Sequence, residues 1–205
     1  MIDNIERMGP ALAGAFNSER LVYRAFQNNE EDKNWVFIHV ESDPLTHGLG
    51  DPAVHKPQTR QASDATMEQR LKNSVLFVMI CLPDKMQPIG TLNVSDAPGY
   101  QRRARFGITM SPEYQSKGFG SEAINWLMDW AFRWGGYHSL TLGASLYNER
   151  AVSAYKKAGF TLEGISRECV YRDRKWHDTC QMSILEHEWE ALRGIISDKS
   201  QPSRG

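Results

Sequence analysis

The chain has 205 residues, is 40% hydrophobic and carries a formal net charge of −1 at pH 7. This suits a single domain, expected over residues 18–196, between an N-terminal extension (1–17) and a disordered tail (197–205). The near-zero charge argues against nucleic acid and anionic membrane surfaces as partners. Since no apolar run reaches membrane-spanning length, we expect no membrane partner.

Cysteine usage and the first residues bear on the compartment. The three cysteines, Cys81, Cys169 and Cys180, are an odd number without metal-type spacing, so we expect reduced thiols and no metal. The first seven residues contain acids and lack the apolar core of a signal peptide. A cytoplasmic protein is therefore predicted.

The first predicted elements are a strand over residues 20–26 and a helix over 28–40. Leu21, Tyr23 and Ala25 alternate with polar positions, as in a half-buried strand. Asn28 precedes three acids, which is typical of a helix start. The stripe expected to be buried on this helix consists of Trp35, Val36, Ile38 and His39.

Residues 41–63 are rich in Pro and Gly and lack periodicity, which predicts a long loop or broken helix. His47 and His55 are interpreted as exposed loop histidines. A short helix is expected over 65–73, followed by a hairpin of strands 75–82 and 88–94. Turn residues at 96–99 lead to another strand over 104–110.

The stretch from Gln115 to Ser121 links that strand to a helix predicted over 117–134. Gly118 and Gly120 allow the backbone to curl so that several N–H groups, and the helix dipole, face one anion. A diphosphate fits such a nest, and Lys117 and Ser121 can add a charge and a hydroxyl.

Two other phosphate motifs fit this stretch less well. Gly118 to Ala123 formally match a dinucleotide fingerprint, but the strand ends too early and no acid lies between Asp129 and Glu149. The phosphate loop of nucleoside triphosphatases is excluded, because Lys117 precedes its glycine. A glycine-rich helix start without a ligand is the remaining alternative for the glycines alone.

The rest of the chain predicts a strand over 138–145, a helix over 151–158, a hairpin of strands 160–171 and 175–185, and a helix over 186–196. Strands and helices that alternate around hairpins indicate a mixed sheet with helices on both faces. We therefore expect an α/β (α+β) fold.

Two motifs together resemble the GNAT superfamily of acyl-CoA-dependent N-acyltransferases. They are Gln115-x-x-Gly118-x-Gly120 and the segment from Asn148 to Phe160. The opening at 18–24 and the segment 174–178 resemble the RimJ/RimL-like branch, and the resemblance covers about residues 19–189. It implies the GNAT fold, a mixed, mostly antiparallel central sheet flanked by helices.

The resemblance implies acetyl-CoA as co-substrate and no metal. Tyr155 falls on the family's tyrosine, whose hydroxyl protonates the departing sulfur. Asn148 would hold the cofactor arm or a water, or would serve only as the N-cap of its helix. The implied cofactor-binding residues are Ile108, Thr109, Met110, Gln115, Ser116, Lys117, Gly118, Phe119, Gly120, Ser121, Asn148 and Tyr155.

The sequence departs from the branch at one catalytic position. Relatives often carry an acid just before the glycine that matches Gly107, where this chain has Arg105 and Phe106. The base must then come from elsewhere, with Glu30, Glu31 and Asp96 as candidates, or a neutral amine attacks directly.

The predicted function is N-acetyl transfer from acetyl-CoA to a primary amine, by direct attack in a ternary complex. The acceptor would be a small molecule, a polyamine-like compound or a protein N-terminus, contacted by Glu30, Glu31 and Trp35. Those acids also suit an ordinary exposed helix start. The alternative function is a catalytically weak acyl-CoA-binding regulatory module, and a homodimer is left open.

Overall fold

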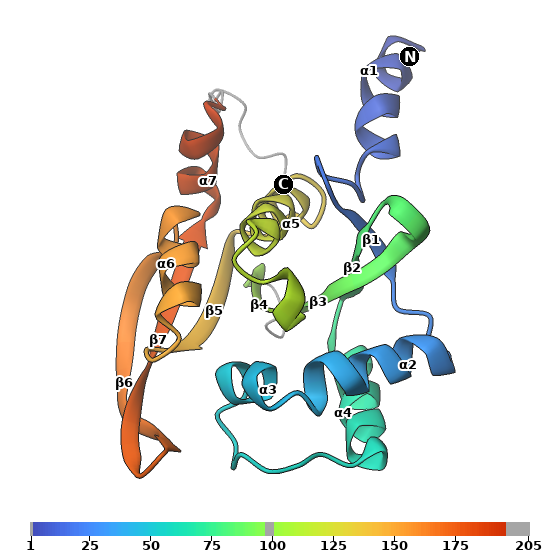
Figure 1. Ribbon diagram of the computed structural model, residues 1–205. Coiled ribbons are helices and arrows are strands. Elements are labelled where there is room, and N and C mark those ends of the chain that lie inside the picture. The colour runs from blue at the N-terminus through green and yellow to red at the C-terminus, as the bar shows by residue number, and fades with distance from the viewer. Residues whose placement is uncertain (1, 97–100, 196–205) are drawn as a thin grey trace.

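The computed structural model describes residues 2–96 and 101–195, with side chains from residue 8 onward. Its strands form a seven-stranded sheet in the order β1-β2-β3-β4-β5-β7-β6 (Figure 1). The strands are β1 (Val22–Ala25), β2 (Leu76–Leu82), β3 (Gln87–Asp96), β4 (Arg103–Met110), β5 (Ser139–Ser145), β6 (Thr161–Arg172) and β7 (Lys175–Leu185).

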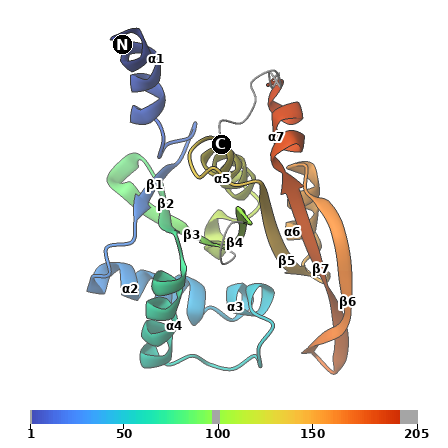
Figure 2. The ribbon, with the colours of Figure 1, turned by 180° about the vertical axis from the view of Figure 1, so that it is seen from behind.

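The helices are α1 (Ile2–Ala13), α2 (Glu30–Val36), α3 (Pro44–Gly50), α4 (Arg60–Asn73), α5 (Phe119–Arg133), α6 (Glu149–Lys157) and α7 (Glu186–Arg193). A π-helical turn, Phe37–Glu41, continues α2. Figure 1 and the reverse view in Figure 2 show α2, α3 and α4 grouped below the sheet, with α5 and α7 at the opposite end. The predicted mixed, mostly antiparallel sheet flanked by helices is confirmed.

Neighbouring strands pair antiparallel except β4 and β5, which run parallel. A parallel pair needs a crossover, and α5 supplies it. Only Arg103, Ala104 and Arg105 of β4 have partners on β5. Beyond Arg105 the two strands separate, while β4 stays paired with β3 through Met110 and β5 with β7 through Ser145. The sheet therefore splits at its centre.

Two apolar clusters hold the layers together. The larger one packs the apolar stripe of α5, including Ile124 and Leu127, against β2–β5 and β7. The smaller one lies on the other face, where α2 and α4 cover Met79 and Cys81 of β2. Alternate residues of β2 thus enter different clusters, as the two-residue period of a strand requires. Each fully buried side chain such as Leu127 contributes about 1.5–3 kcal/mol.

Several predicted elements need correction. Residues 41–63 contain the helix α3, which begins at the N-cap Asp43 with Pro44 at its first position, an arrangement that favours a helix start. The extension 1–17 contains the helix α1. Ile38 was expected in the core but is 48% exposed, because Val36 and Val40 form the buried face and Ile38, two residues from each, points to the opposite side of the turn. The predicted tail 197–205 and most of the turn at 96–99 lie outside the described residues.

Candidate active site

The glycine stretch adopts the curled backbone that its composition predicts. Ser116 and Gly118 have φ of +59° and +84°, and Gly118 is the N-cap of α5. No side chain accepts a hydrogen bond at this helix start, although the first N–H groups of any helix lack intrahelical partners. The first turn of α5 therefore offers unsatisfied donors and the positive end of a helix dipole to an anion.

A cavity of about 200 Å³ lies against this turn, and we call it the glycine-loop cavity. It extends from α5 along the last residues of β4 to the first turns of α6. Ten of the twelve predicted cofactor-binding residues line it: Ile108, Thr109, Met110, Gln115, Ser116, Gly118, Gly120, Ser121, Asn148 and Tyr155.

The other two residues of that prediction do not line the cavity. The Lys117 Nζ lies 5.4 Å from the centre of the Tyr114 ring. The Phe119 ring packs beneath the Arg20 guanidinium, 4.6 Å from its centre. Both side chains therefore pack against the loop and its neighbours and do not form part of the cavity wall.

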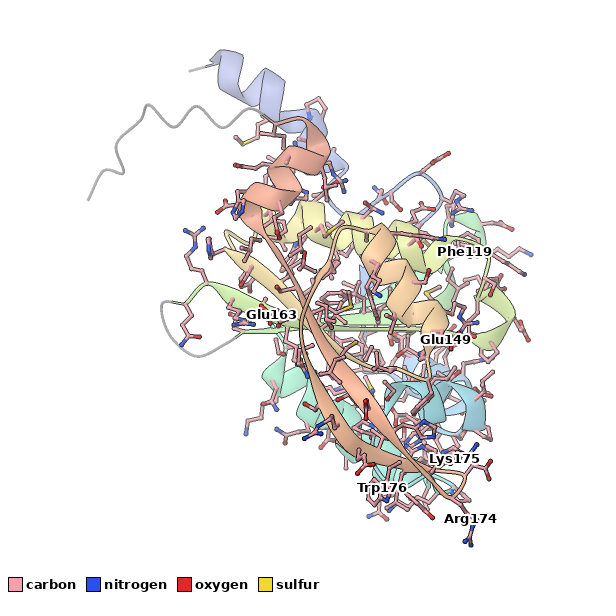
Figure 3. The ribbon with its side chains drawn as sticks, turned by 90° about the vertical axis from the view of Figure 1, so that its left-hand side faces the viewer. Phe119, Glu149, Glu163, Arg174, Lys175 and Trp176 are labelled. Atoms are coloured by element: carbon pink, nitrogen blue, oxygen red, sulfur yellow. The ribbon has the colours of Figure 1, made fainter. Side chains whose placement is uncertain are left out.

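Arg150 is a lining residue that sequence reasoning did not single out. Its guanidinium donates to the Gln115 side-chain oxygen at 2.6 Å, which links α6 to the loop before α5. Figure 3 shows Phe119 and Glu149, at the starts of these two helices, on the same side of the molecule. Arg150 lies inside the motif from Asn148 to Phe160, and its positive charge could have identified it in the sequence as a candidate anion-binding residue. It adds a cation to a cavity that already offers N–H donors.

Tyr155 lies on α6 and is 9% exposed. Burial raises the pKa of its hydroxyl to about 12, so the group stays protonated at neutral pH. Its ring packs edge-on to Phe106 and Phe160. Asn148 caps α6 by accepting from the Ala151 N–H at 3.3 Å and also lines the cavity, so both interpretations of this residue stand.

A second, wider cavity of about 710 Å³ adjoins the first, and we call it the wide cavity. The two share lining residues where β4 and β5 separate: Thr46, Leu49, Gly50, Ile108, Thr109, Asn148, Ala151 and Tyr155. The split in the sheet thus joins a space suited to an anion with a separate space for another molecule.

Helix α3 and the end of the π-helical turn line the wide cavity. Glu41 is 5% exposed and accepts from the Arg70 guanidinium at 2.6 Å. His47 was expected on an exposed loop but is buried, because α3 packs against the sheet. Its Nε2 lies 3.7 Å from Asp51 Oδ2. His47 was misread because a segment rich in Pro and Gly predicted a long loop or broken helix rather than a helix packed on the sheet.

The residues predicted to contact the substrate lie outside both cavities. Glu30 is exposed and pairs with Arg60 at 2.9 Å, and Glu31 is also exposed on the same turn. Trp35 stacks on His39. Asp96, the third base candidate, accepts from the Tyr137 hydroxyl. None of these four residues is brought to Tyr155.

A family model described as an acetyltransferase (GNAT) domain matches residues 19–161. The chain belongs to the GNAT acetyltransferase family. Within this GNAT chain, the matched residues include both motif segments and most of the residues that line the two cavities.

Curated relatives of this GNAT chain are N-acetyltransferases named for different acceptors. Spermidine N(1)-acetyltransferase of Escherichia coli (strain K12) is 31% identical over 115 residues, 56% of this chain and 60% of that protein. The putative ribosomal N-acetyltransferase YdaF of Bacillus subtilis (strain 168) is 27% identical over 175 residues, 85% of this chain and 88% of that protein. The chain therefore matches only about three fifths of the spermidine enzyme's length.

Solved structures agree on the fold. Spermidine N-acetyltransferase from Vibrio cholerae, in complex with CoA and spermine, superposes with a TM-score of 0.73 at 21% identity and covers 84% of this chain and 99% of that one. A GNAT-family acetyltransferase from Bacillus anthracis gives a TM-score of 0.71 at 20% identity, with coverages of 84% and 98%. Of the helices described in this GNAT chain, none is long and apolar enough to cross a membrane.

Proposed function

We propose that this protein transfers an acetyl group from acetyl-CoA to a primary amine in a ternary complex. The observation that carries the proposal is the meeting of two cavities at the split between β4 and β5, with Tyr155 on the shared wall. Family membership makes acetyl transfer the expected chemistry.

The glycine-loop cavity suits the diphosphate and arm of the co-substrate. The first turn of α5 supplies unsatisfied N–H donors, and Arg150 supplies a positive charge. Beyond Arg105 the edge of β4 has no strand partner on the β5 side, so backbone groups near Ile108 and Thr109 can hold an extended arm. Acetyl-CoA supplies an acyl thioester, which an amine can attack.

Two groups of this chain serve the reaction in this proposal. A backbone N–H of β4 stabilises negative charge on the carbonyl oxygen, as preorganised donors do. Tyr155 donates its proton to the leaving sulfur as the C–S bond breaks, and the proton that the amine nitrogen loses on forming the amide restores the Tyr155 hydroxyl. Burial raises the pKa of Tyr155 to about 12, so the hydroxyl is protonated before the reaction. The acceptor amine reaches the carbonyl from the wide cavity and attacks in its neutral form.

An assay of CoA release tests the proposal. The protein is incubated with acetyl-CoA and a panel that contains polyamines, amino acids and a peptide with a free N-terminus, and CoA and acetylated product are measured. Acetyl-CoA-dependent product with at least one amine is expected. Binding of acetyl-CoA without turnover on any amine would favour the acyl-CoA-binding module instead.

The placement of the α2 acids gives a prediction about the acceptor. Changing Glu30 and Glu31 together to Gln is expected to leave the acceptor KM unchanged, because neither carboxylate lines a cavity. Steady-state kinetics at low salt, where screening is weakest, provides the measurement. A rise in the acceptor KM that shrinks with added salt would show that these acids do contribute to acceptor binding.

A further inference from the structure

The charges around the wide cavity bear on which amine it accepts. The charged side chains that line it, among the described residues, are Glu41, Asp51, Arg70 and Arg105, together with His47. Glu41 is paired with Arg70, and Asp51 lies beside His47. Because Glu41 is already paired with the Arg70 guanidinium, Asp51 is the one lining acid among the described residues that has no Lys or Arg partner, and a single carboxylate does not make a site for a polycation.

Arg105 is the lining cation without an acidic partner. It forms no ion pair with any residue that the structure describes, and within that part of the chain its guanidinium makes one hydrogen bond, from Nη1 to Gln181 Oε1 at 3.0 Å. The neighbouring Arg103 on the same strand pairs with Glu163 at 3.0 Å and does not line the cavity.

The exposed side chain of Arg105 extends from β4 across β5 to Gln181 on β7. A Cβ at Gly143 of β5 would lie 2.5 Å from Arg105 Nη2, so the guanidinium extends over the position on β5 that has no side chain. Gln181 of β7 fixes Nη1 from the far side. The guanidinium therefore lies where β4, β5 and β7 meet. Its remaining N–H groups have no acceptor in the part of the chain that the structure describes, so they can donate to a planar anion.

We propose that the acceptor of this enzyme carries a carboxylate besides its primary amine, and that Arg105 binds that carboxylate. The inference rests on the proposed acetyl transfer and narrows its substrate class from amines in general to amino acids and related zwitterions. Arg105 is then a specificity-determining residue.

Pairs of compounds that differ only by a carboxylate give a direct test. Lysine and cadaverine, ornithine and putrescine, and phenylalanine and phenethylamine form three such pairs. Acetylation of each compound is measured for the parent protein, for Arg105→Gln, and for the matched control Arg103→Gln. Arg105→Lys keeps the charge, and circular dichroism confirms that every variant is folded.

The carboxylate-bearing member of at least one pair is expected to have a kcat/KM about tenfold higher, the size of one hydrogen bond to a charged group. Arg105→Gln should remove this preference through the acceptor KM while the KM for acetyl-CoA stays constant. Arg103→Gln should keep the preference, and Arg105→Lys should keep part of it.

Turnover in which no pair favours the carboxylate would overturn the inference while leaving acetyl transfer itself supported. If no compound is acetylated, calorimetric binding of each pair to the CoA-saturated protein decides. Tighter binding of a carboxylate member that is lost in Arg105→Gln supports the inference. Equal binding within each pair, or no binding, rejects it. The proposed activity is judged separately, by turnover over the whole amine panel.

Discussion

Replacing Tyr155 by Phe is expected to lower kcat by about 10²–10⁴-fold, the usual contribution of a positioned general acid. The hydroxyl lies on the wall shared by both cavities, and burial holds its pKa near 12. A thiol with a pKa of about 8.5 is a tolerable leaving group, so its protonation accelerates the reaction without being indispensable. Steady-state kinetics should show this loss in kcat with little change in the KM for acetyl-CoA.

Tyr171→Phe is the matched control, because Tyr171 is 51% exposed on the β6–β7 hairpin and lines neither cavity. For the parent protein, ionisation of Tyr155 should cause no decline in kcat between about pH 7 and pH 10, since its raised pKa keeps the proton in place. An unchanged kcat in Tyr155→Phe, with chemistry rate-limiting, would assign the side chain to packing alone.

Replacing Gly120 by Val is expected to weaken acetyl-CoA binding by about tenfold to a hundredfold, equivalent to losing one or two hydrogen bonds to a charged group. Gly120 sits in the first turn of α5 and lines the glycine-loop cavity. A Cβ added there meets only Met110 Cγ at 3.7 Å, an ordinary contact. The fold should therefore survive, while the branched side chain blocks the approach of a phosphate.

Gly164→Val controls for the same chemical change at a distance from the site. Gly164 lies on the edge strand β6, and a Cβ there meets nothing within 4 Å. Gly118 is unsuitable for this purpose, because its φ of +84° strains any other residue. If calorimetry gives Gly120→Val and the parent the same dissociation constant for acetyl-CoA, the diphosphate does not bind at this turn.

Sequence reasoning succeeded where local patterns determine structure. The alternating strands β1 and β4, the apolar strand β2 and the helix after Gly118 were predicted because strand period, helix period and left-handed glycine geometry are short-range properties. The candidate co-substrate residues followed from two compact motifs. Ten of those twelve residues line one cavity in the structure.

The acceptor side could not be predicted in the same way. Glu41 and Arg70 pair across 29 positions of sequence, and Arg105 meets Gln181 across 76. Such encounters depend on the register of the sheet and on how the helices pack, which no local pattern specifies. Glu30 and Glu31 were expected to contact the acceptor because their carboxylates could attract a cation, yet the fold leaves them at the surface and outside both cavities.

The two strands that border the split between β4 and β5 are held in fixed positions. Each of the two strands keeps its other neighbour along the whole opening, since β3 holds β4 and β7 holds β5. The opening therefore exists before any ligand arrives, and filling it does not require main-chain hydrogen bonds to break. Preorganisation of this kind lowers the entropic cost of association. In the proposed complex with acetyl-CoA, most of the ordering on binding then falls on the flexible arm of the co-substrate, which should limit affinity more than any movement of the protein.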